Sequence, residues 1–244
     1  MYVRILALHV LSMLLPANSL QDSRLLLIRH GRTEMNEHLA QPGNEWGAPN
    51  FYDPGYFDTE LTAVGKQQAR ELHEKFRSSK LPQVDTLCSS PLRRALATAE
   101  IVFDGYTATA ISKRIVTPLA AERLFLSSDV GSPIAELARR FDQAWDLDGT
   151  LQERWWYQGD EASNEWRPPG DYLVPGEPLE AFNERMRRLI DLLRSIKPSK
   201  PDGVVALVCH AEVIYALTGQ AVQNCACIET RQSALPDMPF VLSD

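Results

Sequence analysis

The chain has 244 residues, and its 25 Lys and Arg against 32 Asp and Glu give a formal net charge of −7. This acidic balance excludes a protein that binds nucleic acid through its bulk surface, because such binding needs basic groups to neutralise phosphates. Hydrophobic residues make up 44% of the chain and charged residues 23%, which is typical of a globular protein and excludes disordered, collagenous and coiled-coil classes.

Residues 1–22 are predicted to be a leader. Arg4 precedes the apolar run Ile5–Leu15, and the small residues of Ala17–Ser19 follow it. This pattern is typical of a secretory signal peptide, and the run is too short to span a bilayer, which needs ~20 apolar residues. An upstream start codon or a poorly packed extension is the alternative. The predicted location is therefore the secretory pathway if residues 1–19 are a signal peptide, and the cytoplasm otherwise.

Residues 23–244 are predicted to form a single domain. Continuous apolar runs indicate buried strands over Leu25–Ile28, Val84–Cys88 and Val204–Val208. Amphipathic patterns indicate four helices: one capped by Thr62 that continues to about Ser78, one capped by Ser90 with Pro91 at its first position, one over Leu179–Ile196 and one over Ala211–Leu217. This alternation predicts an α/β fold, with a mostly parallel central sheet between layers of helices.

Two stretches near residues 40–58 and 145–176 interrupt this pattern and are predicted to be loop insertions. Both are rich in Gly, Pro and aromatic residues. Long irregular stretches in a compact domain are usually functional loops or lids. For Trp46, Tyr52 and Trp155 we weigh two roles, contact with a substrate and packing over the sheet.

Charged and polar residues follow three of the predicted strands: Arg29-His30, Ser89-Ser90 with Arg93-Arg94, and His210. Ligands of parallel sheets bind outside the carboxyl ends of the strands, so these side chains should meet there. Guanidinium groups pair with phosphate oxygens, and helix N-termini offer N–H groups and a positive dipole. A histidine can attack phosphorus and carry a covalent intermediate. The combination predicts a site for a phosphoryl group.

Four motifs occur in a fixed order between Leu25 and about Gly219. Arg29–Asn36 fits R-H-G-x-T-x-x-N, Asp58–Ala69 fits D-x-x-L-T-x-x-G-x-x-Q-A, and Ser90–Ala99 fits S-P-L-x-R-A-x-x-T-A. Gly176-Glu177 then precedes the long helix that carries Arg185. This series resembles the histidine phosphatase superfamily, in its phosphoglycerate-mutase-like branch, and it implies that branch's three-layer sandwich.

The resemblance also implies a role for each matching residue. His30 would be the nucleophile that becomes phosphohistidine, and His210 would stabilise the transferring group. Glu122 would protonate the leaving alkoxide and then activate water. The substrate-binding residues would be Arg29, Arg94, Asn36 and Thr33. Arg93 does not match the family's phosphate position and is expected to be a surface charge.

Two departures from the family pattern bear on these roles. Ala211 stands where this branch usually has glycine, and His210-Ala211-Glu212 looks like the H-A-E motif of multiple inositol polyphosphate phosphatases, whose donor is that glutamate. We favour Glu122 as donor because the surrounding motifs are not of that distant branch. Residues 31–36 and 122–125 also differ from the mutase patterns R-H-G-E-S-x-W-N and E-R-H-Y-G, which favours a phosphatase.

The sequence therefore predicts a metal-independent phosphatase that hydrolyses a small phosphomonoester through phosphohistidine on His30. We expect no cofactor and no metal, because this chemistry needs none and no Cys/His cluster suggests one. The expected partner is a small phosphorylated metabolite, with no nucleic acid and no stable membrane span, and the oligomeric state is left open. The alternatives are a phosphoglycerate mutase and a noncatalytic protein that binds a phosphorylated ligand.

Overall fold

The structure is a computed structural model that describes residues 22–45, 48–49, 51–78, 83–106, 111–141, 145, 147, 151–158, 176–200 and 202–241. Residues 1–21 of the predicted leader lie outside these ranges, as do Trp46 and most of the predicted loop insertion at 145–176.

Five strands of the described chain form one sheet in the order β3-β2-β4-β1-β5. They are β1 (Arg24–Arg29), β2 (Val84–Ser89), β3 (Lys113–Val116), β4 (Val204–Cys209) and β5 (Cys227–Arg231). β1, β2, β3 and β4 are parallel, and β5 pairs antiparallel with β1 at the edge. The three strands predicted from apolar runs are β1, β2 and β4, and the predicted, mostly parallel sheet is confirmed.

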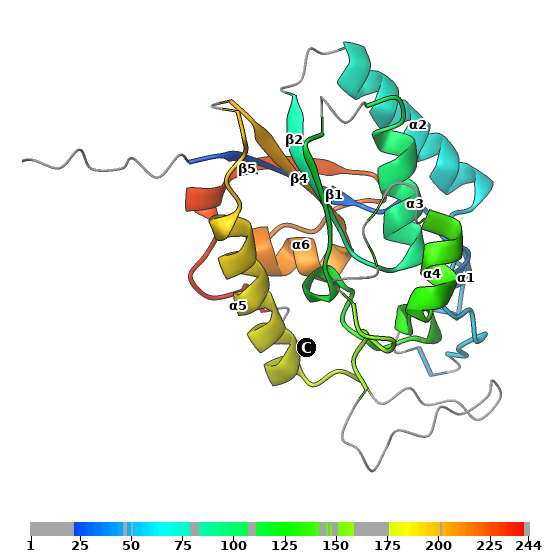
Figure 1. Cartoon of the computed structure of the whole chain (residues 1–244). Helices are drawn as coiled ribbons and strands as arrows, with labels where there is room; N and C mark the ends of the chain where they lie inside the picture. The colour runs from blue at the N-terminus through cyan, green and yellow to red at the C-terminus, as the bar shows by residue number, and fades with distance from the viewer. Residues whose placement is uncertain are drawn as a thin grey trace, which may run out of the picture.

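Helices cover both faces of this sheet (Figure 1). They are α1 (Glu34–Leu39), α2 (Ala63–Ser78), α3 (Arg93–Val102), α4 (Ile134–Phe141), α5 (Leu179–Ser195) and α6 (Ala211–Thr218). Leu26 and Ile28 of β1 pack with α2 and α3, whereas Leu25 and Leu27 pack with α5 and α6. Successive side chains of a strand point to opposite faces, so one apolar run fills two cores, and the three-layer α/β architecture is confirmed. No described helix combines the length and the apolar character that a bilayer crossing requires.

Two strands and two α-helices of the described chain were not predicted from the sequence. β3 and β5 are edge strands with partly exposed side chains, so they lack the continuous apolar run of a buried strand. The helices α1 and α4 have 6 and 8 residues, which is too short to establish a helical period in the sequence.

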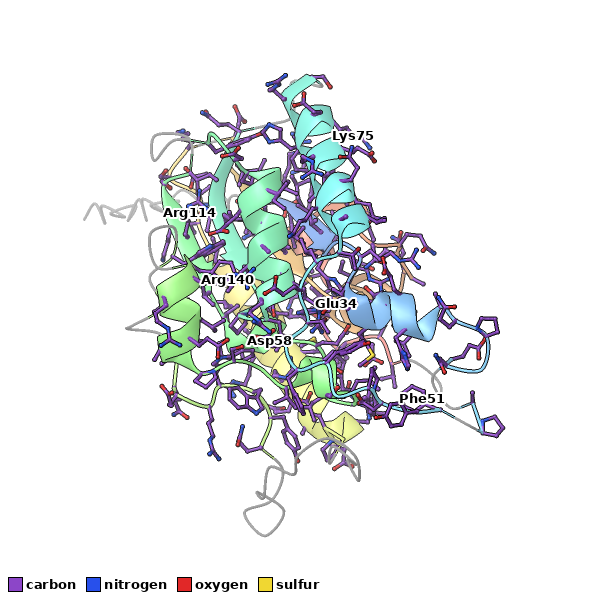
Figure 2. The ribbon with its side chains drawn as sticks, turned by 90° about the vertical axis from the view of Figure 1, so that its right-hand side faces the viewer. Glu34, Phe51, Asp58, Lys75, Arg114 and Arg140 are labelled. Carbon is purple, nitrogen blue, oxygen red and sulfur yellow. The ribbon has the colours of Figure 1, made fainter. Side chains whose placement is uncertain are left out.

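The predicted start of α3 is wrong. The helix begins at Arg93 rather than Pro91, and the Ser90 hydroxyl accepts from the Leu92 N–H at 3.2 Å without capping the helix. Asp58 caps it from a distant part of the chain, because its buried carboxylate accepts from the N–H groups of Arg93 at 2.8 Å and Ser132 at 3.0 Å (Figure 2). The cap of α2 is confirmed, since the Thr62 hydroxyl accepts from the Gly65 N–H at 3.2 Å.

Arg93 is also not the surface charge that the sequence suggested. Its side chain is 20% exposed and lies 3.5 Å from the Asp58 carboxylate. It donates to the main-chain carbonyls of Asp58 at 2.8 Å and Phe57 at 3.1 Å. Arg93 therefore fixes the segment before α2 to the start of α3.

Replacement of Asp58 should destabilise the fold through the loss of a hydrogen-bond acceptor and through backbone strain, and two variants separate these effects. Asp58→Ala removes the acceptor of two buried N–H groups and places alanine at a φ of 42°, so we expect a loss of about 2–4 kcal/mol in the free energy of unfolding. Asp58→Asn should lose less, because asparagine tolerates left-handed backbone and keeps one acceptor oxygen. Urea denaturation measures both, with Asp237→Ala, at a side chain 94% exposed, as the control. Equal midpoints for Asp58→Ala and this control would contradict the assigned role.

Candidate active site

The pairing of β1 with β4 brings His30 and His210 together. Arg29 and Cys209 are paired at the ends of these parallel strands. His30 directly follows Arg29 in the sequence, and His210 directly follows Cys209. The His30 N–H donates to the Cys209 carbonyl at 3.0 Å, and the ring centroids of the two histidines lie 5.1 Å apart. Both side chains are buried. The sequence-based expectation that these groups meet at the carboxyl edge of the sheet is confirmed by this geometry.

His30 has a fixed tautomer. Its Nδ1 lies 2.8 Å from the Gly31 carbonyl oxygen, which can only accept, so Nδ1 carries the proton and Nε2 holds the lone pair. Burial and the positive charges of Arg94 and Arg29 hold the pKa of His30 well below its usual value. The imidazole is therefore neutral at pH 7, which is the form that can attack an electrophile.

In His210 the protein engages the other ring nitrogen. Its Nε2 lies 2.8 Å from the Ser90 hydroxyl, which accepts from the Leu92 N–H and can donate its own proton to Nε2. With Ser90 as the donor, Nδ1 carries the N–H, and it is buried without a hydrogen-bond partner among the described residues. Burial and the charge of Arg94 lower the pKa of His210 well below its usual value. A neutral ring with one unpaired, buried N–H suits an incoming oxygen acceptor.

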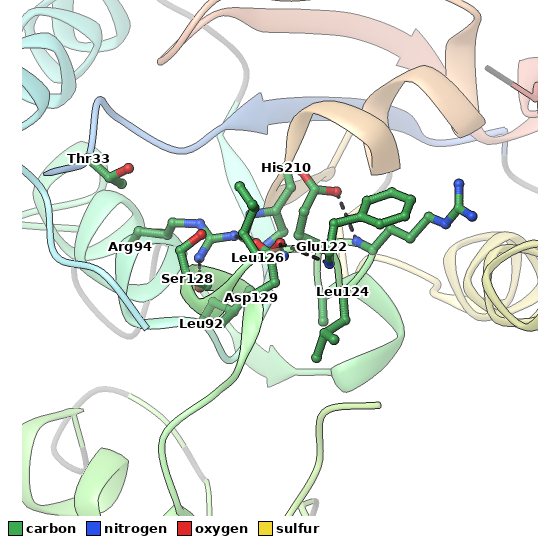
Figure 3. A network of polar contacts seen from close by, with 12 residues as sticks. Thr33, Leu92, Arg94, Glu122, Leu124, Leu126, Ser128, Asp129 and His210 are labelled. Carbon is green, nitrogen blue, oxygen red and sulfur yellow. Dashed lines mark hydrogen bonds and ion pairs between the residues drawn. The ribbon is translucent and has the colours of Figure 1, made fainter. Parts of the chain in front are cut away.

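Arg29 and Arg94 are both held by the protein. The Arg29 Nη1 donates to the Val222 carbonyl at 2.7 Å, while its buried Nε has no partner in the described part of the chain. Arg94, 4% exposed, donates from Nη1 to the Ser128 carbonyl at 2.5 Å and from Nη2 to the Asp129 carboxylate at 2.8 Å (Figure 3). Each terminal nitrogen of a guanidinium carries two N–H groups. Both arginines therefore keep donors for an anion after these bonds are made.

Asp129 was missed by the sequence analysis. It lies in the short 3-10 turn Ser127–Asp129, and its buried carboxylate also accepts from the N–H groups of Phe125 and Leu126. Burial raises its pKa, against the opposing effect of Arg94. No motif marks this position in the sequence, because only the folded chain places the turn beside α3.

Thr33 and Asn36 form the capping box of α1. The Thr33 hydroxyl accepts from the Asn36 N–H at 3.2 Å, and the Asn36 amide oxygen accepts from the Thr33 N–H at 3.2 Å. Asn224 donates both to Asn36 and to the His30 carbonyl, each at 3.1 Å. These contacts fix the backbone around His30, and direct contact of either side chain with a phosphoryl group stays a prediction.

Two carboxyl groups, Glu122 and Glu212, lie in the same region. Burial, together with the negative charges of Glu212 and Asp129, raises the pKa of Glu122, against the opposing charge of Arg94. Burial also raises the pKa of Glu212, which lies in the first turn of α6, and Arg123 opposes it. Within the described ranges, no three or more His, Cys, Asp or Glu side chains form a group suited to a metal ion.

An ion pair with a buried carboxylate fixes the segment that carries Glu122. Arg185 of α5 donates to both carboxylate oxygens of Glu177, at 2.9 Å and 2.6 Å. The same guanidinium donates to the carbonyls of Leu119 at 2.9 Å, Ala121 at 2.7 Å and Glu122 at 3.3 Å. Bidentate pairs of this kind have a defined geometry. The Gly176-Glu177 and Arg185 motif therefore positions the backbone of Glu122.

Comparison with known proteins identifies the family. The family model described as histidine phosphatase superfamily (branch 1) matches residues 25–227. Among similar solved structures, the ecdysone phosphate phosphatase of Bombix mori has 18% identity and a TM-score of 0.51 and covers 91% of this chain and 95% of its own. The structure described as mycobacterial hydrolase 1 has 23% identity and a TM-score of 0.50, with 86% and 92% covered. No relative among curated proteins matches the sequence. The fold and the family model agree with the motifs, and the chain belongs to branch 1 of the histidine phosphatase superfamily.

Proposed function

We propose that the protein is a phosphatase that hydrolyses a small phosphomonoester through a phosphohistidine on His30. One observation carries the proposal: the Gly31 carbonyl fixes the His30 proton on Nδ1 and leaves the Nε2 lone pair next to His210. Nε2 attacks phosphorus, the bond from phosphorus to the leaving oxygen breaks, and that oxygen takes a proton from Glu122. The unpaired N–H groups of His210 Nδ1 and Arg29 Nε would bind phosphoryl oxygens.

Hydrolysis of the phosphohistidine completes the cycle. The Glu122 carboxylate formed in the first step takes a proton from water as the water oxygen attacks phosphorus. The bond from phosphorus to Nε2 breaks, its electron pair returns to the imidazole, and inorganic phosphate leaves. The alcohol and phosphate together account for the ester and one water molecule. Glu122 ends protonated, as it began, so no metal or cofactor enters the balance.

Replacement of the nucleophile should abolish turnover. His30→Ala should lower kcat/KM for phosphomonoesters by at least roughly a thousandfold, because no other group takes over the covalent step. Wild type, after acid-free quenching of a substrate pulse, should carry an acid-labile, base-stable phosphate that His30→Ala lacks. His73→Ala, at a histidine on α2 whose Nδ1 lies 3.0 Å from the Val102 carbonyl, is the control. Isomerisation of 3-phosphoglycerate without phosphate release would instead indicate a mutase, and absence of both reactions and of the phosphoenzyme would indicate a noncatalytic binder.

The choice between the two carboxyl groups can be tested with leaving groups of different acidity. Glu122→Gln should slow phosphoenzyme formation from an alkyl phosphate by roughly 100-fold or more, because the alkoxide then leaves unprotonated. The same variant should slow phosphoenzyme formation from 4-nitrophenyl phosphate far less, since 4-nitrophenolate leaves without a proton. Glu212→Gln should show no such difference between the two esters. The reverse pattern in rapid-quench measurements would assign the donor to Glu212.

The raised pKa of Glu122 predicts a pH dependence of the first chemical step. The donor must be protonated, so phosphoenzyme formation from an alkyl phosphate should be fastest below the raised pKa and should slow as the pH rises through it. The fall should be absent in Glu122→Gln and retained in Glu212→Gln. Single-turnover rates of the three proteins over the same pH series provide the measurement. A decline of equal size in Glu122→Gln would show that another group titrates.

A further inference from the structure

A cavity opens beside the carboxyl group of Glu122. Its wall includes three consecutive aromatic residues, Trp155, Trp156 and Tyr157, together with apolar residues of the 118–124 segment. Glu122 and Asp129 belong both to this wall and to the site around His210 and Arg94. On the proposed function, the leaving oxygen takes its proton from Glu122. The cavity therefore lies where the alcohol part of the substrate must be placed.

The aromatic wall is anchored to the body of the protein. Trp155 is 8% exposed, and its indole N–H donates to the Ser132 carbonyl at 3.0 Å. Its ring lies so close to the chain that a Cβ on Gly131 would come within 2.2 Å of it, which explains the glycine at that position. Trp156 stands perpendicular to Trp155, with ring centroids 5.5 Å apart. Trp156 and Tyr157 are partly exposed and line the cavity beside this anchor.

The charges of the described wall do not suit an anionic alcohol. Glu122, Asp129 and Glu177 contribute carboxyl groups, and Arg185 is the single cation among the described lining residues. Arg185 is engaged, because its guanidinium donates to both oxygens of Glu177 and to three main-chain carbonyls. Asp129 and Glu177 are paired with Arg94 and Arg185 in turn, so a carboxylate or second phosphate placed here would lose its hydration without gaining a partner among the described lining residues.

We propose that this cavity binds the alcohol part of the substrate and selects phosphomonoesters of uncharged, largely apolar ring alcohols. The inference rests on the proposed function and narrows it to a substrate class. Aromatic side chains bind such rings through apolar burial and through offset or edge contacts. Among the described residues, the unused donors lie at the phosphoryl site, and the cavity supplies apolar area for the remainder of the molecule.

Three esters whose alcohols have nearly the same acidity test the proposal on the wild-type protein. Benzyl phosphate should exceed methyl phosphate in kcat/KM by roughly tenfold or more, because the ring buries apolar area in the cavity. The kcat/KM for 4-carboxybenzyl phosphate should fall below that for benzyl phosphate by at least roughly tenfold, because Arg185, the cation of the described wall, is already paired with Glu177. These three probes differ in the alcohol alone, so the comparison isolates the cavity from the phosphoryl site.

Substitutions in the aromatic wall of the cavity provide a second test of the proposal. Trp156→Ala and Tyr157→Ala should each lower kcat/KM for benzyl phosphate by roughly fivefold to fiftyfold more than for methyl phosphate. Phe240→Ala is the matched control, because this aromatic side chain is 47% exposed, packs on Gly219 at the end of α6 and is not among the residues that line the cavity. Circular dichroism of each variant before the assay shows whether it has folded, and the wild-type comparison stands without any variant.

The outcomes separate this inference from the proposed function. The cavity proposal would be overturned if 4-carboxybenzyl phosphate were hydrolysed as fast as benzyl phosphate. It would also be overturned if methyl phosphate were hydrolysed as fast as the other two esters. Either result would leave the proposed phosphatase function intact. An equal loss on benzyl and methyl phosphate in Trp156→Ala and Tyr157→Ala would overturn it too. Absence of turnover and of a phosphoenzyme with all three esters would overturn the proposed function itself.

Discussion

The pairing of β1 with β4 is the constraint on which the site depends. Two parallel strands in register end at Arg29 and Cys209, and the His30 N–H continues the ladder to the Cys209 carbonyl at 3.0 Å. A slip of one residue would turn the side chains of β1 to the opposite faces of the sheet. Such a slip would exchange Leu25 and Leu27 with Leu26 and Ile28 between two cores that are each packed around the present side chains. The packing of both cores therefore fixes the position of the two histidines.

Burial also sets the protonation states, and it does so in opposite directions. It lowers the pKa values of His30 and His210, which lose a positive charge on deprotonation, and it raises that of Glu122, which gains a negative one. On the proposed function, the same withdrawal from water gives a neutral nucleophile and a protonated donor at neutral pH. The acidic total of −7 does not oppose this, because Arg29 and Arg94 concentrate positive charge in a small volume. A dianionic phosphoryl group bound there would hold the Glu122 proton still more firmly.

The sequence predicted those parts of the structure that are determined locally. Apolar runs identified β1, β2 and β4, and the residues directly after them identified His30 and His210. What it could not predict depends on segments far apart in the chain. Asp58 caps α3 across 35 residues of sequence and Asp129 pairs with Arg94 across another 35, and neither carries a local pattern. Ser90 illustrates the same limit, because a hydroxyl expected to cap a helix lies instead against His210.

One ion pair links the chemistry of the site to the charge of its cavity. Arg185 binds both oxygens of Glu177 and three carbonyls of the 119–122 segment, so it fixes the backbone from which the Glu122 side chain extends. Those same bonds use the donors that would otherwise face a ligand in the cavity. A partly buried cation whose donors are all used contributes geometry rather than attraction, since its charge is already neutralised at contact distance. The placement of Glu122, the proposed proton donor, and the lack of an available cation among the described residues beside it therefore have a single origin. An anionic alcohol would have to break that pair to gain a partner there.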